Sequence, residues 1–574
     1  MASVPPEPAK VKTTLVVGID FGTTFSGVSW LICKTGSTPG QPDIISQWPT
    51  SIDNRRGNSD SQKVPTKVHY NPDGELSWGF RTPVNVETVE WFKLLLLNDE
   101  DLQTHLRGSQ HLHDAQKMMS RLRKNAIQLT GDYLKALWDH ALGQIINAKG
   151  QTLVDGMPIN VILTVPAVWT DYARDRMREA ATLAGILKDR GIEKTTLAFI
   201  SEPEAAAIAT VPELQNRGDL QVGDSFIVLD AGGGTVDIIS YRVNGVLCGG
   251  TFLDKEFESL LKDAVGQISW HKMDGSDIRR MMNNEWEHGI KEAFDGEPDN
   301  YAVEIPSRAQ RAPLQFSSDE LRPIFDKIMS KVAELTQRQL NAIKQKTSRL
   351  PKLVILVGGF GRSLFMLKHL RAKLPTQITI LQAQGGKPWT AICRGATLSL
   401  AAELCSPREE SFVKSRIARL NYGWEYHTLF QYGVHDLRDR FWSDKLREWR
   451  ARHQMEWVIK RGDDISLKEA KTYEYFIPWP VNQQGYDDIS ATVYTCEDLN
   501  PPTRKEDNVR TVASFTFKTP KPVERFKRVY TDDRHSYRRW SYGWKVIVSG
   551  ASFDMYLVFD GKEKKMERIV VDVK

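Results

Sequence analysis

The chain has 574 residues, of which 41% are hydrophobic and 26% are charged, and its formal net charge is +5. That length provides for several domains with large buried cores, and the composition is ordinary for globular proteins. A net charge this small on so long a chain gives no general attraction to nucleic acid or to an anionic membrane.

The five cysteines lie far apart and form no Cys-x-x-Cys motif, which argues against a zinc ribbon or a redox dithiol. Buried free thiols in a reducing compartment are the simpler interpretation. The first residues lack the long apolar core of a secretion signal, and the run KLLLLND is too short to span a bilayer. We therefore expect a cytoplasmic protein, with access to the nucleus left open and no contact with a membrane.

The first third of the chain predicts a strand hairpin and then helices. Residues 1–12 are rich in proline and predict a disordered tail. TTLVVGID (13–20) and SGVSWLIC (26–33) each predict a buried strand, and only FGTTF separates them. Apolar residues at helical spacing follow over residues 115–148.

Strands and helices then alternate as far as about residue 405. INVILTV is a strand that ends at Pro166, and SFIVLDAGGGTVDIISYRV predicts strand, tight turn, strand. LVILVGG is a buried strand followed by a glycine turn. Helices are expected over 170–186, 201–211, 321–344 and 362–374. This alternation implies an α/β architecture over residues 13–405.

The pattern changes near CSPREESFVKS. Beyond it, short alternating stretches such as MEWVIKR, ISATVYTCE and TVASFTF are separated by turn residues, which predicts a β-rich C-terminal domain over residues 406–574. We expect one helical insertion in it, over residues 437–454. RFKRVYTDDRHSYRRWSYGWK (525–545) mixes basic and aromatic residues as single-strand nucleic-acid platforms do, but a solvated charged face is the simpler interpretation. Nucleic acid is therefore not an expected partner.

An internal repeat links two glycine turns. VVGIDFGTT (16–24) and IVLDAGGGT (227–235) share an apolar run, an aspartate, a glycine and a threonine, and each is followed by a strand. A P-loop would need GxxxxGK[ST], and a dinucleotide turn would need GxGxxG entering a helix, and neither pattern is present. What remains is a hairpin whose glycines leave backbone N–H groups open to an anion. An ordinary glycine-rich hairpin stays the alternative.

The side chains around these turns suggest a phosphate and a metal. Thr23, Thr24 and Thr235 would add hydroxyl donors. The aspartates Asp20, Asp230 and Asp237 would repel a phosphate unless Mg²⁺ or its waters lay between them, since this hard ion prefers oxygen ligands.

Five segments in this order carry a family resemblance: GIDFGTT, VPAVW, SEPEAAAIAT, LDAGGGTVDI and LVGGFGRS. Over roughly residues 13–405 the chain resembles the actin-like ATPase domain of the seventy-kilodalton heat-shock chaperones, the DnaK type. WFKLLL, ARLNYGW and WVIKRGDDI make it similar to the divergent heat-shock seventy-kilodalton protein 12 subgroup. The resemblance implies two duplicated α/β lobes around a nucleotide cleft: a first lobe over 13–215, a second over 216–380, and a return to the first over 381–405.

The resemblance also implies ATP or ADP with Mg²⁺ as cofactors, and a set of residue roles. The first phosphate loop would be Asp20, Gly22, Thr23 and Thr24, and the second Asp230, Gly232, Gly233, Gly234 and Thr235. Asp20, Asp230 and Asp237 would organise both Mg²⁺ and the attacking water. Asp20 and Asp230 would bind the metal through water, and Glu202 would lie near the metal's water shell. Pro166 would couple cleft closure to the rest of the chain, and Gly358, Gly359 and Arg362 would lie against the adenosine.

Two further assignments depart from the family pattern. Lys93 in WFKLLL is the expected phosphate-contacting lysine, and a solvated helix lysine is the alternative. The ribose contacts would be Glu287 and Lys291, but their spacing is one residue longer than the family's, and Asp295 stands near the position of a small hydroxyl residue. Either the helix register differs there or the affinity for nucleotide is altered.

The C-terminal part departs further. The short leucine-rich acidic linker of standard chaperones is absent from AAELCSPREESFVKS, and the end IVVDVK lacks the acidic motif that recruits cochaperones. The β-rich domain is then a divergent domain for binding unfolded peptide or one specific protein partner.

Three classes of function remain open. A chaperone that hydrolyses ATP slowly would close its lobes on nucleotide and bind many apolar peptides, with an affinity that differs between ATP and ADP. An ATP-binding scaffold or regulator with little hydrolysis would bind one partner through the C-terminal domain. A small-molecule kinase of the same fold would show ATP turnover that one metabolite stimulates.

Overall fold

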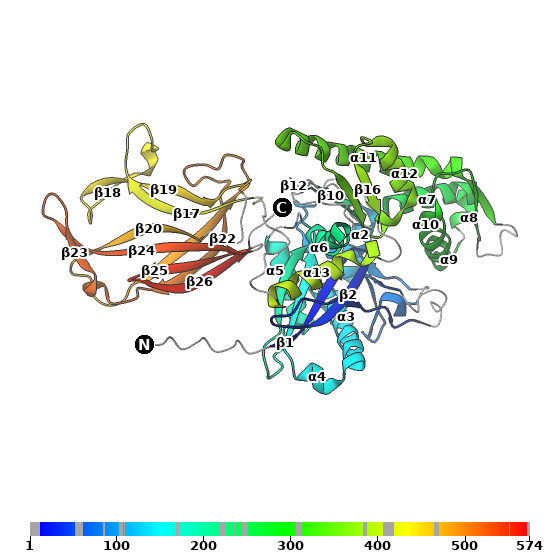
Figure 1. The fold of residues 1–574 in the computed structure, drawn as a ribbon, viewed down its shortest axis with the longest axis horizontal. Helices are drawn as coiled ribbons and strands as arrows, with labels where there is room; N and C mark the ends of the chain where they lie inside the picture. Colours follow the sequence, from blue (N-terminus) through cyan, green and yellow to red (C-terminus); the bar gives the residue numbers. More distant parts are fainter. Residues whose placement is uncertain are drawn as a thin grey trace. The chain divides into compact units, whose positions relative to one another are not determined.

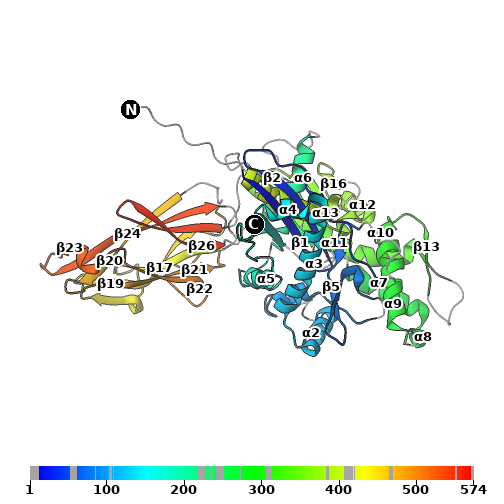
Figure 2. The same ribbon diagram turned by 90° about the horizontal axis from the view of Figure 1, so that it is seen from below.

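The computed structural model describes residues 12–51, 61–83, 86–102, 107, 109–167, 169, 171–216, 226–232, 236–240, 242–243, 251–271, 273–305, 313–382, 387–405, 418, 420–463, 470–549 and 552–570. The chain divides into two compact units, Met1–Ser411 and Phe412–Lys574. The first mixes helices with several sheets, and the second is built of strands (Figure 1 and Figure 2). The coarse expectation of an α/β part followed by a β-rich part is confirmed.

The first sheet of unit 1 is built on the hairpin expected at FGTTF. In sheet order its strands are β3 (Asp43–Ile44), β2 (Phe25–Lys34), β1 (Thr13–Phe21), β8 (Ile159–Val165) and β9 (Thr196–Ser201), and β4 (Val64–Pro65) pairs with β2. β1 and β2 are antiparallel, whereas β8 and β9 continue the sheet in parallel. Leu15 and Val17 pack with α3 (Ala126–Lys149) and α5 (Asp171–Leu183), while Val16 joins a core on the opposite face. The strand is therefore buried on both sides, which explains its unbroken apolar run.

The second sheet repeats this plan. Its strands are β12 (Arg242–Val243), β11 (Val236–Ser240), β10 (Phe226–Ala231), β15 (Leu353–Val357) and β16 (Thr379–Gln382). β10 and β11 form an antiparallel hairpin, and β15 and β16 follow in parallel. Val228 of this sheet and Val16 of the first share one core with α6 (Glu202–Asn216) and α13 (Lys387–Cys405). Both glycine turns thus join two antiparallel strands, as the repeat predicted; the two-lobe boundaries stay a prediction.

Further helices surround the two sheets. They are α2 (Gln110–Leu122), α4 (Gln151–Asp155), α7 (Thr251–Val265), α8 (Gln267–His271), α9 (Gly275–Met281), α10 (Lys291–Ala293), α11 (Ser318–Thr347) and α12 (Leu364–Lys373), with the 3₁₀ turns η2 (Gly79–Arg81), η3 (Phe92–Leu96) and η5 (Phe360–Arg362) and the π-helix η4 (Met282–Ile290). The small sheets contain β5 (Lys67–Tyr70), β6 (Leu76–Trp78) and β7 (Val89–Glu90), and β13 (Asn300–Val303) and β14 (Leu314–Ser317). In the part of the chain that the structure describes, no helix has the length and apolar character that crossing a bilayer requires.

The helical pattern over residues 115–148 belongs to two helices. The chain leaves α2 through Arg123, which takes a left-handed conformation at φ 53°. Asn125 then begins α3 with a capping box, because its side chain accepts from Gln128 N–H while the Gln128 side chain accepts from Asn125 N–H.

Unit 2 consists of two antiparallel sheets of five strands each. The first contains β18 (Arg440–Ser443), β19 (Glu448–Ile459), β17 (Asn421–Leu429), β21 (Asp488–Cys496) and β22 (Arg510–Lys518), and the second contains β20 (Ala470–Pro480), β24 (Ser536–Ser549), β25 (Ser552–Phe559) and β26 (Lys562–Val570), with β23 (Lys527–Tyr530) on β24. The turns η6 (Leu437–Asp439) and η7 (Val523–Arg525) interrupt the strands. Trp424 and Phe517 of the first sheet share a core with Trp479, Trp540 and Trp544 of the second.

The helical insertion expected over residues 437–454 is wrong. After η6 the chain forms the β18–β19 hairpin, in which Trp442 pairs with Trp449, with ring centroids 5.4 Å apart. The Arg440 guanidinium lies 3.8 Å from the centre of the Trp449 ring. These cross-strand and cation–π contacts stabilise the hairpin, whereas the charged residues between them suit a solvated helix equally well.

Candidate functional site

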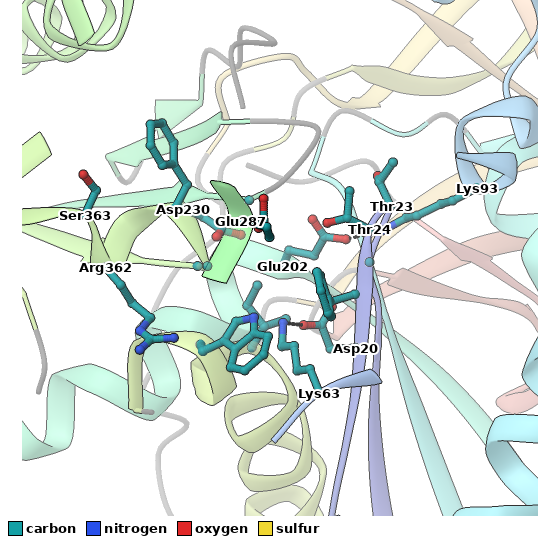
Figure 3. Close-up of a pocket in the computed structure, with 18 of the residues that line it drawn as sticks. Asp20, Thr23, Thr24, Lys63, Lys93, Glu202, Asp230, Glu287, Arg362 and Ser363 are labelled. Atoms are coloured by element: carbon teal, nitrogen blue, oxygen red, sulfur yellow. Dashed lines mark hydrogen bonds and ion pairs between the residues drawn. The ribbon is translucent and has the colours of Figure 1, made fainter. Parts of the chain in front are cut away.

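A cavity in unit 1 opens where the two hairpins, α6, the η4–α10 segment and the turn after β15 meet (Figure 3). Its volume is about 1130 Å³, part of which is open to solvent. The predicted site residues in its lining are Asp20, Gly22, Thr23, Thr24, Lys93, Pro166, Glu202, Asp230, Gly232, Glu287, Lys291, Gly358, Gly359 and Arg362. The structure therefore brings together residues from widely separated segments of the chain.

Four predicted residues are not placed in the lining. Gly233, Gly234 and Thr235 lie outside the described residues, and for Asp237 only the backbone, in β11, is described. The strands on either side of these glycines pair as far as Ala231 and Val236. The phosphate and water contacts expected of these four residues stay predictions.

Seven lining residues were not predicted. They are Phe25, Lys63, Glu292, Phe360, Ser363, Trp389 and Ile392. Four of them adjoin predicted site residues in the sequence, but Lys63, Trp389 and Ile392 do not. Trp389 and Ile392 stand in α13, and Lys63 stands in a polar segment that no motif marks.

Asp20 and Lys63 form a buried ion pair. Lys63 Nζ donates to Asp20 Oδ2 at 2.5 Å, and the two side chains are 6% and 2% exposed. Thr164 Oγ1 donates to the other oxygen, Asp20 Oδ1, at 3.2 Å. Burial by itself would lower the pKa of Lys63, but Asp20, together with Cys393 and Asp230, outweighs it, and the pKa of Lys63 is raised. Lys63 is thus charged at neutral pH.

Lys93 and Glu202 form a second buried pair. Lys93 Nζ donates to Glu202 Oε1 at 2.6 Å, with the lysine side chain 2% exposed. The ammonium also lies 5.7 Å from the centre of the Phe21 ring and 5.5 Å from that of Trp169. Burial raises the pKa of Glu202, and the nearby Asp20 adds to this, although Lys93 opposes it. Lys93 is therefore not a solvated helix lysine, and it stands on the cavity wall.

The second hairpin and the turn after β15 meet without room for a side chain. Asp230 lies near the end of β10, where it pairs with Val357 of β15, and it is 4% exposed. A Cβ at residue 358 would lie 2.5 Å from Asp230 Oδ1 and 2.4 Å from the Ala231 carbonyl oxygen. Gly358 also takes φ +85°, a region that L side chains rarely adopt. Glycine is therefore required at this position.

The irregular spacing at the expected ribose site is matched by a π-helix. η4 (Met282–Ile290) lies just before Lys291, and in a π-helix the backbone hydrogen bonds join residues five apart, one more than in an α-helix. Lys291 Nζ donates to Glu287 Oε2 at 2.6 Å and to Asp254 Oδ1 at 2.7 Å, while Trp286 Nε1 also donates to Asp254 Oδ1 at 2.6 Å. Burial raises the pKa of Asp254 to about 6, with Glu287 adding to the effect and Lys291 opposing it. The ribose contacts of Glu287 and Lys291 stay a prediction.

A flat wall of the cavity combines an arginine with aromatic rings. The Arg362 guanidinium lies 5.8 Å from the centre of the Trp389 ring, and Phe25 meets that ring edge-on at 5.6 Å. A Cβ at residue 359 would lie 3.4 Å from Trp389 Nε1, so this turn runs beside the indole. Arg362 also pairs with Glu292 at 2.6 Å. Such a wall can accept the face of a planar ring.

The lining does not fit a divalent cation at Asp20. Magnesium needs carboxylate oxygens that are open to the ion or to its waters, and both oxygens of Asp20 accept from Lys63 and Thr164. Within the described ranges, no three or more His, Cys, Asp or Glu side chains are grouped so as to hold a metal ion. The cationic residues of the lining are Lys63, Lys93, Lys291 and Arg362, and the acidic ones are Asp20, Glu202, Asp230, Glu287 and Glu292.

No protein-family model matches the chain, but curated relatives do. Mouse heat shock 70 kDa protein 12A is 24% identical over 319 residues, which cover 44% of this chain and 46% of that protein. Human heat shock 70 kDa protein 12B is 24% identical over 327 residues, which cover 45% of this chain and 46% of that protein. A chaperone protein HscA homolog of Acinetobacter baumannii (strain AYE) is 27% identical over 384 residues, which cover 62% of this chain and 53% of that protein. Over these stretches the chain is similar in sequence to the heat-shock 70 kDa proteins and to a chaperone.

This relationship confirms the resemblance that the motifs predicted, including the similarity to the protein 12 subgroup. The chain spans about half the length of the curated relatives it matches. The names of these relatives describe heat-shock proteins and a chaperone.

Proposed function

We propose that this chain is an ATP- and ADP-binding, slowly hydrolysing, chaperone-like protein whose nucleotide state controls the binding of a peptide or protein partner. The cavity that both strand hairpins and the Gly358–Gly359 turn line is the observation that carries this proposal. Its relatives among the heat-shock 70 kDa proteins and the chaperones support the same function. Closure of two lobes on the nucleotide belongs to the proposal.

The lining suggests where each part of the nucleotide binds. Backbone N–H groups of the two hairpin turns would hold the phosphates, with hydroxyl groups of Thr23 and Thr24 at the first turn. Lys93 would stabilise phosphate charge from the side of η3. The adenine would lie against Trp389 and Arg362, and Glu287 with Lys291 would contact the ribose. The predicted second loop, Gly232, Gly233, Gly234 and Thr235, would complete the site.

Hydrolysis in such a site would depend on positioning. Glu202, Asp230 and Asp237 are the candidates for orienting the attacking water, with Thr235 beside it. Because Glu202 is held by Lys93 at 2.6 Å, it is not a free base, which favours slow turnover. No step is assigned to Mg²⁺, since the contacts of Asp20 do not fit it.

Calorimetric titration of the full chain with ATP and with ADP, each with and without Mg²⁺, tests the nucleotide-binding part. We expect saturable binding of both nucleotides. Limited proteolysis in the same conditions reports whether nucleotide closes unit 1. If neither nucleotide binds in any condition, the proposal fails.

Unit 2 offers a groove for the partner. Its volume is about 1680 Å³, part of it open to solvent, and it runs between the β18–β19 hairpin and β20. Nine of its lining residues are tryptophan, tyrosine or phenylalanine: Trp424, Tyr426, Phe441, Trp442, Tyr475, Phe476, Tyr494, Tyr542 and Trp544. Within the described chain, β18 pairs only with β19 and β20 only with β24, so each presents an edge. An extended apolar segment suits such edges and rings.

A panel of apolar and charged peptides tests the partner-binding part. A chaperone should bind many apolar peptides, and its affinities should differ between ATP and ADP.

We keep the cytoplasm, with access to the nucleus, as the proposed location, on the composition and cysteine usage alone. Imaging of the tagged full-length protein in cells tests this location.

A second candidate is an ATP-binding scaffold or regulator with little hydrolysis. The Lys63–Asp20 pair favours it, because a carboxylate that is already paired is a poor organiser of metal and water. Single-turnover measurements distinguish the two. Persistent ATP together with retained nucleotide binding would support the scaffold, and steady phosphate release would support the chaperone.

A further inference from the structure

Lys63 reaches the cavity through space that a glycine provides. It directly precedes β4, where Val64 pairs with Ser26 of β2. In the β1–β2 ladder Asp20 pairs with Gly27, and a Cβ at residue 27 would lie 3.1 Å from Lys63 Cγ and 3.4 Å from Lys63 Cε. The aliphatic stem of Lys63 therefore packs on β2 where no side chain stands, and its ammonium group ends at Asp20 (Figure 3).

The position of this ammonium group is the one that a cation at Asp20 would need. It lies 2.5 Å from Asp20 Oδ2, and neither side chain is more than 6% exposed, so solvent screens the pair little. The second carboxylate oxygen accepts from Thr164. A carboxylate neutralised in this way no longer repels a polyphosphate as a bare carboxylate does.

We propose that Lys63 serves as a built-in cation at Asp20, so that the cavity binds the phosphates of ATP and ADP with little dependence on Mg²⁺. This inference rests on the proposed nucleotide binding and adds the regulation of that site. Lys63 is a positioning residue here, since it acts through Asp20 and is not assigned a contact with the reacting atoms.

Equilibrium binding of ADP to the full chain tests the inference without reference to turnover. The dissociation constant is measured with saturating Mg²⁺ and with EDTA, for the native chain and for Lys63→Met. For the native chain we expect the two constants to agree within about threefold. Lys63→Met exposes the charge of Asp20, so its affinity in EDTA should fall at least about tenfold, and Mg²⁺ should restore it.

Three variants control for other effects. Lys63→Arg keeps the positive charge and should behave as the native chain. The double variant Lys63→Met with Asp20→Asn removes both charges and should bind ADP independently of Mg²⁺. Lys135→Met removes an exposed lysine, 59% exposed in its pair with Asp139, and should change nothing.

The outcomes separate the two proposals. A native chain that binds ADP only with Mg²⁺ overturns the inference and leaves the proposed function standing. No binding of ADP in either condition overturns the proposed function itself. Should Lys63→Met fail to fold, the native chain and the double variant still decide, because both are expected to bind ADP in EDTA.

Discussion

Gly395 of α13 lies directly on the backbone of Ala205 in α6. A Cβ at residue 395 would stand 1.6 Å from the Ala205 carbonyl oxygen, closer than any real side chain could come. α6 begins at Glu202, and the first turn of α13 carries Trp389, so this crossing sets the distance between two walls of the cavity.

Gly395→Ala is therefore expected to destabilise unit 1. The added methyl group must push the two helices apart, and overpacking of this kind costs about 1–3 kcal/mol in the free energy of unfolding. Gly143→Ala is the matched control, because Gly143 is also helical, in α3, and a Cβ there meets nothing within 4 Å. That change should stabilise by roughly 0.5–1 kcal/mol, since alanine loses less conformational freedom than glycine on folding. Denaturant unfolding of both variants checks the opposite signs; equal signs would contradict the packing argument.

The Lys93–Glu202 pair should behave as one unit. Lys93→Met leaves Glu202 buried without its partner, and breaking a buried pair costs about 3–5 kcal/mol. Glu202→Gln added to Lys93→Met should recover most of that loss, because no unpaired charge remains. Denaturant unfolding of the two single variants and the double variant completes the cycle.

Lys135→Met measures the cost of losing an exposed ion pair, with which the cost of Lys93→Met is compared. Its Lys135–Asp139 pair is exposed and spans one helical turn, so its loss should cost at most about 0.5 kcal/mol. If Lys93→Met costs no more than this, burial does not govern the Lys93–Glu202 pair and the assignment of that wall is wrong.

Asp254 predicts a pH dependence of stability. Burial raises its pKa from 3.8 to about 6 in the folded chain, so between these values the folded state binds more protons than the unfolded state. Its contribution to stability therefore falls as the pH rises from about 4 to about 6, by up to about 3 kcal/mol at 1.36 kcal/mol per pKa unit.

Asp254→Asn removes this titration. The free energy of unfolding of the native chain, relative to Asp254→Asn, should decline across that window and be level above it. Denaturant unfolding at pH values below, within and above the window provides the measurement. If the difference in unfolding free energy between the native chain and Asp254→Asn does not vary with pH, Lys291 and Trp286 stabilise the Asp254 carboxylate as well as water does in the unfolded chain.

Much of unit 1 could be predicted from the sequence, because its strands are continuous apolar runs and its turns carry glycines with specific roles. Gly358 is an example: the close approach to Asp230 leaves no alternative residue, and the motif LVGG marks it. The strands of the two hairpins could be predicted for the same reason, because each is an apolar run next to a glycine turn. Such positions are specified locally, so the local sequence reports them.

Lys63 and the β18–β19 hairpin could not be predicted in this way. Lys63 meets Asp20 only through the pairing of β4 with β2 and the missing side chain at Gly27, a relationship among three separate segments. In the hairpin, Trp442 and Trp449 are seven residues apart, a spacing that also suits one face of a helix. Tertiary pairing decides both, and the local pattern of residues does not report it.

The same two tryptophans offer a test of the groove in unit 2. Trp442 and Trp449 are 41% and 44% exposed, stand opposite each other, and contact one another's ring. Trp442 lines the groove, whereas Trp449 is not part of its lining. Replacing either with alanine removes the same ring pair, and Trp449→Ala also removes the Arg440 contact, so the hairpin loses at least as much in Trp449→Ala, whereas only Trp442→Ala changes the groove lining.

We expect Trp442→Ala to weaken the binding of a labelled apolar peptide at least about tenfold, as loss of a buried aromatic contact does. Trp449→Ala should leave the affinity within about threefold of the native chain. Fluorescence anisotropy with the full chain, at matched nucleotide conditions, measures both. Equal losses would show that the peptide depends on the hairpin as a whole, and no loss in either variant would place the peptide elsewhere on unit 2.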